Sequence, residues 1–449
     1  MVHVHVPFLV LLFSSGFLPL ATALCSSSSF SFYPSSVIEW LDSEGISYRH
    51  YDNSNSNRNS NSDNSCHPFQ AFSSRTRNPL LHIFYYPSDS GKAYDEEDPR
   101  SGVWLHILPS PNHKQRSEDP TCNYDMTNFA TDRGLGLIHL HQDVWSSKPN
   151  IVQSRLLARL GNTKTRLFAR KTTVKRIRAS LALPFLKEHH LWSATKAKYY
   201  YGLFHNNNNK SNNNKSNNAE EELVAVASFS SRRKVVRCGI PHRSHELIRF
   251  CSRRDGNVVG GITKLIQAFV REHNPDDIVT VVDRDWGSGN GWYSLGFQSV
   301  HVMPPLPMVV GVEDGVRRHL VGAGIRHSHN TTAIQIEQDC NNNNGRIGLE
   351  PHVLKELEGS HDYKQSVQFL EEHGYCPVYD AGVERMFKII DTQKEKARNE
   401  QETQQSSSSS VTHTSTELWE HSVPQYASTY YSMNAGIAAM LRHAEQQTL

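Results

Sequence analysis

The segment that decides the fold spans His245 to Phe297 and reads HELIRFCSRRDGNVVGGITKLIQAFVREHNPDDIVTVVDRDWGSGNGWYSLGF. It joins a strand-like run, Glu246 to Cys251, to a glycine pair, Gly260-Gly261, that opens an amphipathic helix. A second apolar run, Ile278 to Val282, predicts a buried strand that ends at Asp283. Free amides and the helix dipole favour anions at the start of a helix, so this unit predicts a site for a phosphate-bearing cofactor.

The chain has 449 residues, which allows two or three domains, but low-complexity tracts reduce the folded part. Such tracts bury too little apolar surface to offset chain entropy, so we interpret them as insertions or linkers. They are Asn53–Asn64, Asn206–Asn218, Asn341–Asn344 and Ser406–Ser410.

The N-terminus is apolar from Val6 to Leu24 and carries small residues at Ala21-Thr22-Ala23, as secretory signals do. The Ser-rich stretch Ser26–Ser36 makes a plastid presequence the alternative. We therefore expect residues 1–24 to direct the chain to the secretory pathway, a plastid or another organelle. After its removal we expect no stable membrane association; an uncleaved anchor is the other reading.

Seven cysteines are irregularly spaced and do not form a disulfide framework. Cys238, His242, His245 and Cys251 are the only metal-like cluster in the sequence, but their spacing fits no zinc module. We predict no metal site.

Apolar periodicity predicts an α/β protein with two folded units, residues 80–160 and 161–390. A low-complexity region with a short helix at Val37–Gly45 precedes them, over residues 25–79. A polar tail, residues 391–449, follows them and contains a C-terminal helix at Tyr426–His443. Further predicted helices are Ile151–Leu160 and Ala179–His190, and the predicted strands are Leu80–Tyr86, Leu135–His141, Arg166–Ile177, Lys198–Phe204, Leu223–Phe229 and Ser299–Met303.

Several motifs carry a family resemblance. They are GLGLIHLHQDVW (Gly134–Trp145), ARKTTVKRI (Ala169–Ile177), PFLKEHHLW (Pro184–Trp192), ELVAVASFS (Glu222–Ser230), ELIRFCSRRDGNVVGGITKL (Glu246–Leu265), DRDWGSGNGWYSLGF (Asp283–Phe297) and GYCPVYDAG (Gly374–Gly382). With them, residues from about 134 to 390 resemble phage-encoded Hef-like homing endonucleases, in which a nuclease-like domain precedes a GNAT-like acyltransferase domain. The second half also resembles the phage Mom family of DNA-modification proteins. The resemblance implies a GNAT-like mixed sheet flanked by helices, preceded by a small restriction-endonuclease-like α/β domain.

The resemblance implies acetyl-CoA as cofactor. In GNAT acetyltransferases a Q/R-x-x-G-x-G/A loop wraps the pyrophosphate, and the matching segment here is Asn257–Ile262, with Ile262 in place of the last small residue. The alternative is that the glycine pair only makes a tight turn. We expect the pyrophosphate to meet backbone amides and two side chains at Val259, Gly260, Gly261, Thr263 and Lys264.

The residues at the expected catalytic positions depart from the family pattern. The family's general-acid tyrosine would stand at Trp292, and Tyr293 is displaced by one residue, or by about 100° on a helix. Asp283, at the end of a buried strand, is the candidate general base or substrate anchor. The alternative for Asp283 is a structural pair with Arg284. We assign Asp283 and Tyr293 as the catalytic candidates.

For the first unit, the resemblance implies a very-short-patch-repair or restriction-type nuclease, which needs clustered carboxylates and a lysine. His82 stands at the first acidic position, the strand part of Gly102–Gln115 has no acidic residue, and no lysine lies between Asn123 and Trp145. Only His106, His113 and Asp143 remain, which do not form an obvious metal triad. We expect nuclease activity to be lost and DNA to be bound by shape and charge.

The net charge is only +2, yet the run from Lys164 to Arg178 has no acidic residue. This run predicts a nucleic-acid surface, with a solvated strand face as the equally weighted alternative. The assigned residues are Arg166, Arg170, Lys171, Lys175, Arg176 and Arg178.

Two hypotheses follow. The first is an acyl-CoA-dependent N-acyltransferase with nucleic acid as one candidate acceptor. The second is a DNA-binding or homing-endonuclease-like protein whose GNAT-like domain is a non-catalytic scaffold, its cofactor cleft filled by side chains such as Ile262 and Trp292. The sequence leaves the acyl group, the acceptor and the oligomeric state open.

Overall fold

The computed structural model describes residues 32–51, 67–72, 75–76, 78–84, 98–110, 119–206, 221–237, 240–254, 256–305, 307–319, 347–357, 362–390 and 440. Predictions for the targeting segment, the low-complexity tracts and the C-terminal helix lie outside these residues, apart from Asn206 and Met440.

The first unit runs α1 (Phe32–Ser43), β1 (Ser47–Tyr51), β2 (Leu80–Phe84), β3 (Val103–Leu108), α2 (Cys122–Asp132), β4 (Leu137–His141), α3 (Gln142–Ser147), α4 (Pro149–Arg159). Its sheet has the order β1-β2-β3-β4, antiparallel except for the β3–β4 pair, which is parallel. Every residue of β2, β3 and β4 is buried because helices and loops cover both faces. The helices α1, α3 and α4 cover one face, whereas α2 and Phe69 cover the other.

The second unit is built on a larger mixed sheet. Its path is β13 (Gln298–Met303), β18 (Val383–Ile389), β12 (Asp277–Asp283), β10 (Ile240–Ser252), β8 (Glu221–Phe229), β7 (Tyr199–Asn206), β6 (Thr172–Arg176), and β9 (Arg233–Arg237) pairs with β10. Only β10 and β12 run parallel along this path.

Helices cover both faces of this sheet. The helix α5 (Ala179–His189) packs on Tyr200 and Val226. The helix α6 (Gly261–His273) packs on the other face, where Phe269 stacks on Phe229 with ring centroids 3.9 Å apart. A short helix, α7 (Asn290–Tyr293), follows β12. The predicted α/β class is therefore confirmed.

One predicted strand, Arg166–Ile177, was wrong. The segment forms β5 (Thr165–Phe168) and β6, separated by one 3-10 turn, η2 (Ala169–Lys171). The turn is closed by the Thr172 hydroxyl, which donates to the Ala169 carbonyl at 2.7 Å. As a result β5 leaves the main sheet and pairs in parallel with β11 (Gly256–Val259).

The sequence analysis missed an inserted subdomain, residues 307–379, between β13 and β18. It contains β14 (Pro307–Gly311), β15 (Arg317–His319), β16 (Ile347–Gly348), α9 (Pro351–Leu357), α10 (Tyr363–Glu372) and β17 (Tyr375–Tyr379). Its sheet, ordered β16-β15-β14-β17, packs on α9 and α10 through its own core around Val309, Leu357 and Leu370.

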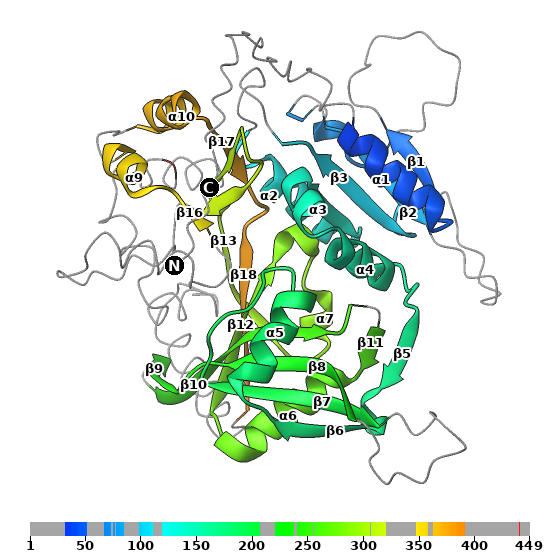
Figure 1. Ribbon diagram of the computed structural model, residues 1–449, viewed down its shortest axis with the longest axis vertical. Helices are drawn as coiled ribbons and strands as arrows, with labels where there is room; N and C mark the ends of the chain where they lie inside the picture. The colour runs from blue at the N-terminus through cyan, green and yellow to red at the C-terminus, as the bar shows by residue number, and fades with distance from the viewer. Residues whose placement is uncertain are drawn as a thin grey trace, which may run out of the picture.

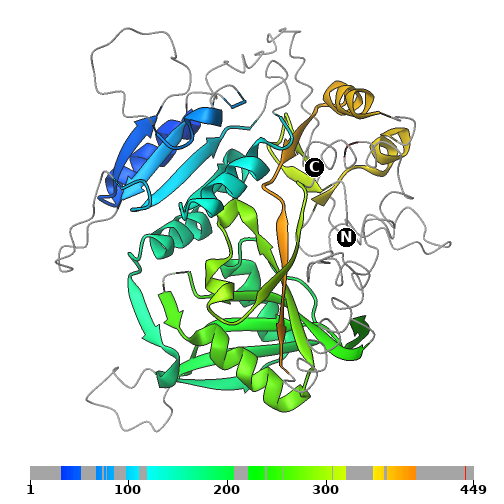
Figure 2. The ribbon, with the colours of Figure 1, turned by 180° about the vertical axis from the view of Figure 1, so that it is seen from behind.

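The three parts meet at one junction. In both views, α3 and α4 lie between the first sheet and the second unit, and α9 and α10 lie to one side (Figures 1 and 2). The turn η3 (Arg284–Trp286), which follows β12, contacts β4 and α2 at this junction. No helix of the described residues is long and apolar enough to cross a membrane.

Candidate functional site

The central strands β10 and β12 separate early. They pair only from Ser244 with Asp277 to Glu246 with Val279. Beyond that, β10 shifts register against β8 between Leu247 and Arg249. The Thr280 hydroxyl donates to the Leu247 carbonyl at 3.1 Å, so a side chain takes the place of the next ladder bond. The C-terminal halves of these two strands thus diverge at the centre of the sheet.

The glycine pair lies at the start of α6. Gly260 has φ +76° and is the N-cap of α6, without a side-chain capping bond. Since the first intrahelical bond runs from the Lys264 amide to the Gly260 carbonyl, the amides of Gly261, Ile262 and Thr263 have no acceptor within the described residues. Val259 ends the adjoining strand β11, so the five predicted cofactor residues do lie together.

Lys264 has a contact that the sequence analysis did not foresee. Its ammonium donates to the Ala169 carbonyl at 2.8 Å and to the Thr172 carbonyl. The side chain therefore fixes η2 beside the start of α6. The Lys264 ammonium therefore lies close to the amides at the start of α6, but it donates its hydrogen bonds to backbone carbonyls of η2 and β6.

Asp283 lies at the end of β12 and is only partly exposed. Its carboxylate accepts hydrogen bonds from the Trp192 indole at 2.7 Å and from the Asp285 amide at 3.0 Å. Burial, together with the nearby Asp285 carboxylate, raises the pKa of Asp283 to about 6. Asp283 is therefore a stronger base than an ordinary aspartate.

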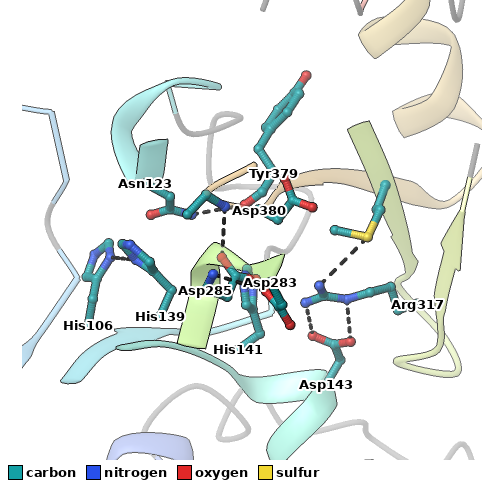
Figure 3. Close-up of polar contacts among 12 residues, drawn as sticks. His106, Asn123, His139, His141, Asp143, Asp283, Asp285, Arg317, Tyr379 and Asp380 are labelled. Carbon is teal, nitrogen blue, oxygen red and sulfur yellow. Dashed lines mark hydrogen bonds and ion pairs between the residues drawn. The ribbon is translucent and has the colours of Figure 1, made fainter. Parts of the chain in front are cut away.

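Asp285 connects this site to the first unit. Its carboxylate accepts from the Ala381 amide at 2.8 Å and lies 3.3 Å from the His141 Nε2 atom. Burial raises the pKa of Asp285 to about 7. Figure 3 shows Asp283, Asp285 and His141 together, with His106 and His139 on one side and Asp143 and Arg317 on the other.

Tyr293 lies elsewhere. Its hydroxyl donates to Glu384 at 2.5 Å, and burial with this hydrogen bond raises the pKa of Tyr293 to about 12. Glu384 pairs with Val282 across β18 and β12, and successive strand residues point to opposite faces. Tyr293 and Asp283 therefore lie on opposite faces of the sheet, and the structure does not bring the two catalytic candidates together. Trp292 packs edge-to-face on Phe297, with ring centroids 5.3 Å apart.

A buried ion pair joins the first unit to the inserted subdomain. The Arg317 guanidinium donates to both carboxylate oxygens of Asp143, each at 2.7 Å. Both side chains are 7% exposed. The sequence analysis singled out Asp143 only as a remnant of a nuclease site, and no sequence signal pointed to Arg317 as its partner.

Buried histidines lie on β2, β3 and β4 of the first unit. His82 stacks on Trp104, with ring centroids 4.0 Å apart, and burial lowers the pKa of His82 to about 4. The Nδ1 atoms of His106 and His139 lie 3.0 Å apart, and burial lowers the pKa of His106 to about 3. Among the described residues, no His, Cys, Asp and Glu side chains are grouped to hold a metal ion. His113 lies outside those residues.

The six predicted nucleic-acid-binding residues are all exposed but differ in their partners. Lys175 pairs with Glu221, and Arg176 pairs with Glu272 at 2.5 Å. Within the described residues the other four make no ion pair; they are Arg166, Arg170, Lys171 and Arg178. The guanidiniums of Arg166 and Arg170 lie 5.8 and 4.9 Å from the ring of the exposed Phe168.

No protein-family model matches the chain, and no curated protein matches its sequence.

Proposed function

We propose that the second unit is a GNAT-like acyl-CoA-dependent N-acyltransferase with nucleic acid as the candidate acceptor. One observation carries the proposal: the parallel strands β10 and β12 pair at only three positions, next to a helix whose first three amides have no acceptor within the described residues. The strand order β6-β7-β8-β10-β12-β18-β13 also supports it, because the GNAT fold places its one parallel pair at this point of the sheet.

The residues at the start of α6 fit a pyrophosphate. The amides of Gly261, Ile262 and Thr263, which have no acceptor among the described residues, and the positive end of the α6 dipole attract an anion there. Arg166 and Arg170 add unpaired positive charge on β5 and η2, which lie beside this helix start. When bound, the cofactor would supply an activated acyl thioester.

Asp283 is the residue that we assign to proton removal from the acceptor amine. At neutral pH a carboxyl with a pKa of about 6 is mostly ionised, and the raised pKa makes it a better proton acceptor than an exposed aspartate. Trp192 and the Asp285 amide orient the carboxylate. We assign no general acid, because Tyr293 lies on the opposite face and donates to Glu384.

For the first unit we propose DNA binding without cleavage. The order α1-β1-β2-β3-α2-β4, with a parallel last pair, supports the resemblance to restriction-type nucleases. His82 and His106 are neutral, buried groups and supply no carboxylate for a divalent cation.

The second candidate is a nucleic-acid-binding protein whose GNAT-like unit is a scaffold. The exposed Phe168 between Arg166 and Arg170 favours it, since aromatic and guanidinium groups together bind bases and phosphates. A scaffold would not require acyl-CoA.

Calorimetric titration of the full chain with acetyl-CoA tests the proposal. The matched variants are Thr263→Glu and Thr263→Gln, because Thr263 is only partly buried and occupies the first turn of α6. A glutamate there suits the helix dipole but repels a pyrophosphate, whereas glutamine keeps the size without the charge. We expect wild type and Thr263→Gln to bind and Thr263→Glu to lose binding. Failure of wild type to bind acetyl-CoA at millimolar concentration would leave the scaffold function.

A further inference from the structure

The helix α4 of the first unit directs two arginines at the loop after β12. Arg155 and Arg159 are four residues apart and therefore share one face of α4. The Arg155 guanidinium lies over the ring of Trp286, 4.5 Å from its centroid. An Arg159 guanidinium nitrogen lies 2.7 Å from the place where a Cβ atom on Gly287 would be.

Gly287 is what allows this approach. Its φ of +122° is strained for other residues, and a Cβ atom at this position would displace the end of the flexible Arg159 side chain. Gly287 thus leaves room for the Arg159 guanidinium beside the loop of the second unit.

Within the described part of the chain, Arg155 and Arg159 make no hydrogen bond and no ion pair, and Asp283 is the carboxylate that acts on Arg155 across a longer distance. Both side chains remain accessible to solvent, yet desolvation by the protein around them lowers the pKa of both guanidiniums.

Further positive charge surrounds the pair. Lys148 and Arg249, together with Arg155, lie close enough to His190 to disfavour its protonation. Asp283 is the carboxylate that attracts Arg155, and Asp143 is the one that attracts Lys148, but Asp143 is bound on both oxygens by Arg317. Two like charges four residues apart on a helix repel each other, so an anion between them would relieve an unfavourable arrangement.

We propose that Arg155 and Arg159 bind a phosphate group of the acceptor, so that the first unit completes the acceptor side of the second unit's site. The proposal rests on the proposed transferase function. Guanidinium groups match phosphate because each presents a planar fork of N–H donors to two oxygens. Asp283, the carboxylate that attracts Arg155 from a longer distance, would then take up the amine proton of the bound acceptor.

Binding of two phosphate probes to the full chain tests this inference. Adenosine 5′-monophosphate represents a small phosphorylated acceptor, and single-stranded hexathymidylate represents a nucleic acid; adenosine is the probe without phosphate. The variant is Arg155→Gln with Arg159→Gln. Arg133→Gln is the matched control, because Arg133 is also exposed and stacks on an aromatic ring, Phe129, at 3.7 Å but lies outside the site.

We expect one of the two phosphate probes to bind wild type and adenosine not to bind. The double glutamine variant should bind that probe at least about tenfold more weakly, since two charge-assisted contacts are lost. For the oligonucleotide, the slope of log affinity against log salt should fall by about 1.4. The probe that responds identifies the source of the phosphate.

The inference is overturned if wild type binds neither phosphate probe, or if the double glutamine variant binds as wild type does. The double variant Arg155→Lys with Arg159→Lys separates the effect of charge from an effect on folding. It should retain part of the affinity for the phosphate probe. If it binds the probe as weakly as the double glutamine variant and melts at a lower temperature than wild type, the arginines have a structural role. Acetyl-CoA titration of the double glutamine variant keeps the two proposals apart. If the double glutamine variant binds both acetyl-CoA and the phosphate probe as wild type does, only the phosphate-binding role of the arginines is refuted. If the phosphate probe binds only when the arginines are present, but wild type does not bind acetyl-CoA, only the transferase function is refuted.

Discussion

Breaking the ion pair between Asp143 and Arg317 should be among the most destabilising single changes in this protein. Arg317→Met removes the guanidinium and leaves the Asp143 carboxylate buried, 7% exposed, without its bidentate partner. Loss of one partner of a buried pair costs about 3–5 kcal/mol of unfolding free energy. Because the pair joins α3 to β15, we expect the inserted subdomain to loosen from the first unit first.

The loss should depend on pH in a defined direction. In wild type, burial acts to raise the pKa of Asp143, but Arg317 holds this pKa below its ordinary value. The ion pair therefore stabilises the fold fully above the pKa that Asp143 has in the unfolded chain. This stabilisation is lost only as the pH falls through the lower pKa of Asp143 in the folded chain. Without Arg317, the raising effect of burial is opposed only by weaker contributions such as that of His141, so we expect the pKa of Asp143 to rise. Protonation of Asp143 then removes the unpaired buried charge from Arg317→Met. The difference in unfolding free energy between wild type and this variant should therefore shrink as the pH falls from 7 towards 4.5.

Urea unfolding followed by tryptophan fluorescence measures both effects. Arg176→Met is the control, since its pair with Glu272 is exposed and such pairs contribute about 0.2–1 kcal/mol. Asp143→Asn combined with Arg317→Met should recover part of the loss because no charge stays buried. A loss of unfolding free energy from Arg317→Met that is no larger than that of the control, and the same at pH 7 and pH 4.5, would show that this ion pair contributes no more than an exposed one.

Three further results are expected. The Trp192 indole N–H resonance should titrate with a midpoint near pH 6, because that group donates to Asp283, and Asp283→Asn should abolish the titration; a midpoint near 4 would remove Asp283 as the base. In thermal melts, Gly382→Ala should destabilise far more than Gly45→Ala: both glycines have positive φ, but only at Gly382 would the new Cβ lie 2.3 Å from a backbone oxygen, that of Met303. Equal melting shifts would contradict this contact. Replacing the basic residues that make no ion pair within the described structure by glutamine should reduce the slope of log DNA affinity against log salt by about 0.9 per residue, more than replacing the ion-paired Lys175 and Arg176; these residues are Arg166, Arg170, Lys171 and Arg178. Equal slopes would argue against that surface.

The strongest local signals in the sequence predicted the elements around the site. The glycine pair predicted the start of α6, and the apolar run from Ile278 predicted β12 and the place of Asp283 at its end. These features are local, since a positive-φ glycine and a short apolar run act within a few residues.

Other features depend on contacts between distant segments. The pair of Asp143 with Arg317, separated by 174 positions, has no local signal, and the basic run does not show which of its charges meet Glu221 and Glu272. The break between β5 and β6 arises because β11 offers β5 a partner outside the main sheet. The inserted subdomain was missed because its strands are short and low-complexity sequence interrupts them.

We propose that acetyl-CoA binds at the start of α6, where the amides of Gly261, Ile262 and Thr263 have no acceptor within the described structure. Hydrogen–deuterium exchange of the full chain, with and without acetyl-CoA, reports on these amides directly. We expect acetyl-CoA to slow exchange in peptides covering residues 257–264 and in the C-terminal half of β10. Unchanged exchange in those peptides under saturating acetyl-CoA, or protection confined to another part of the chain, would contradict it.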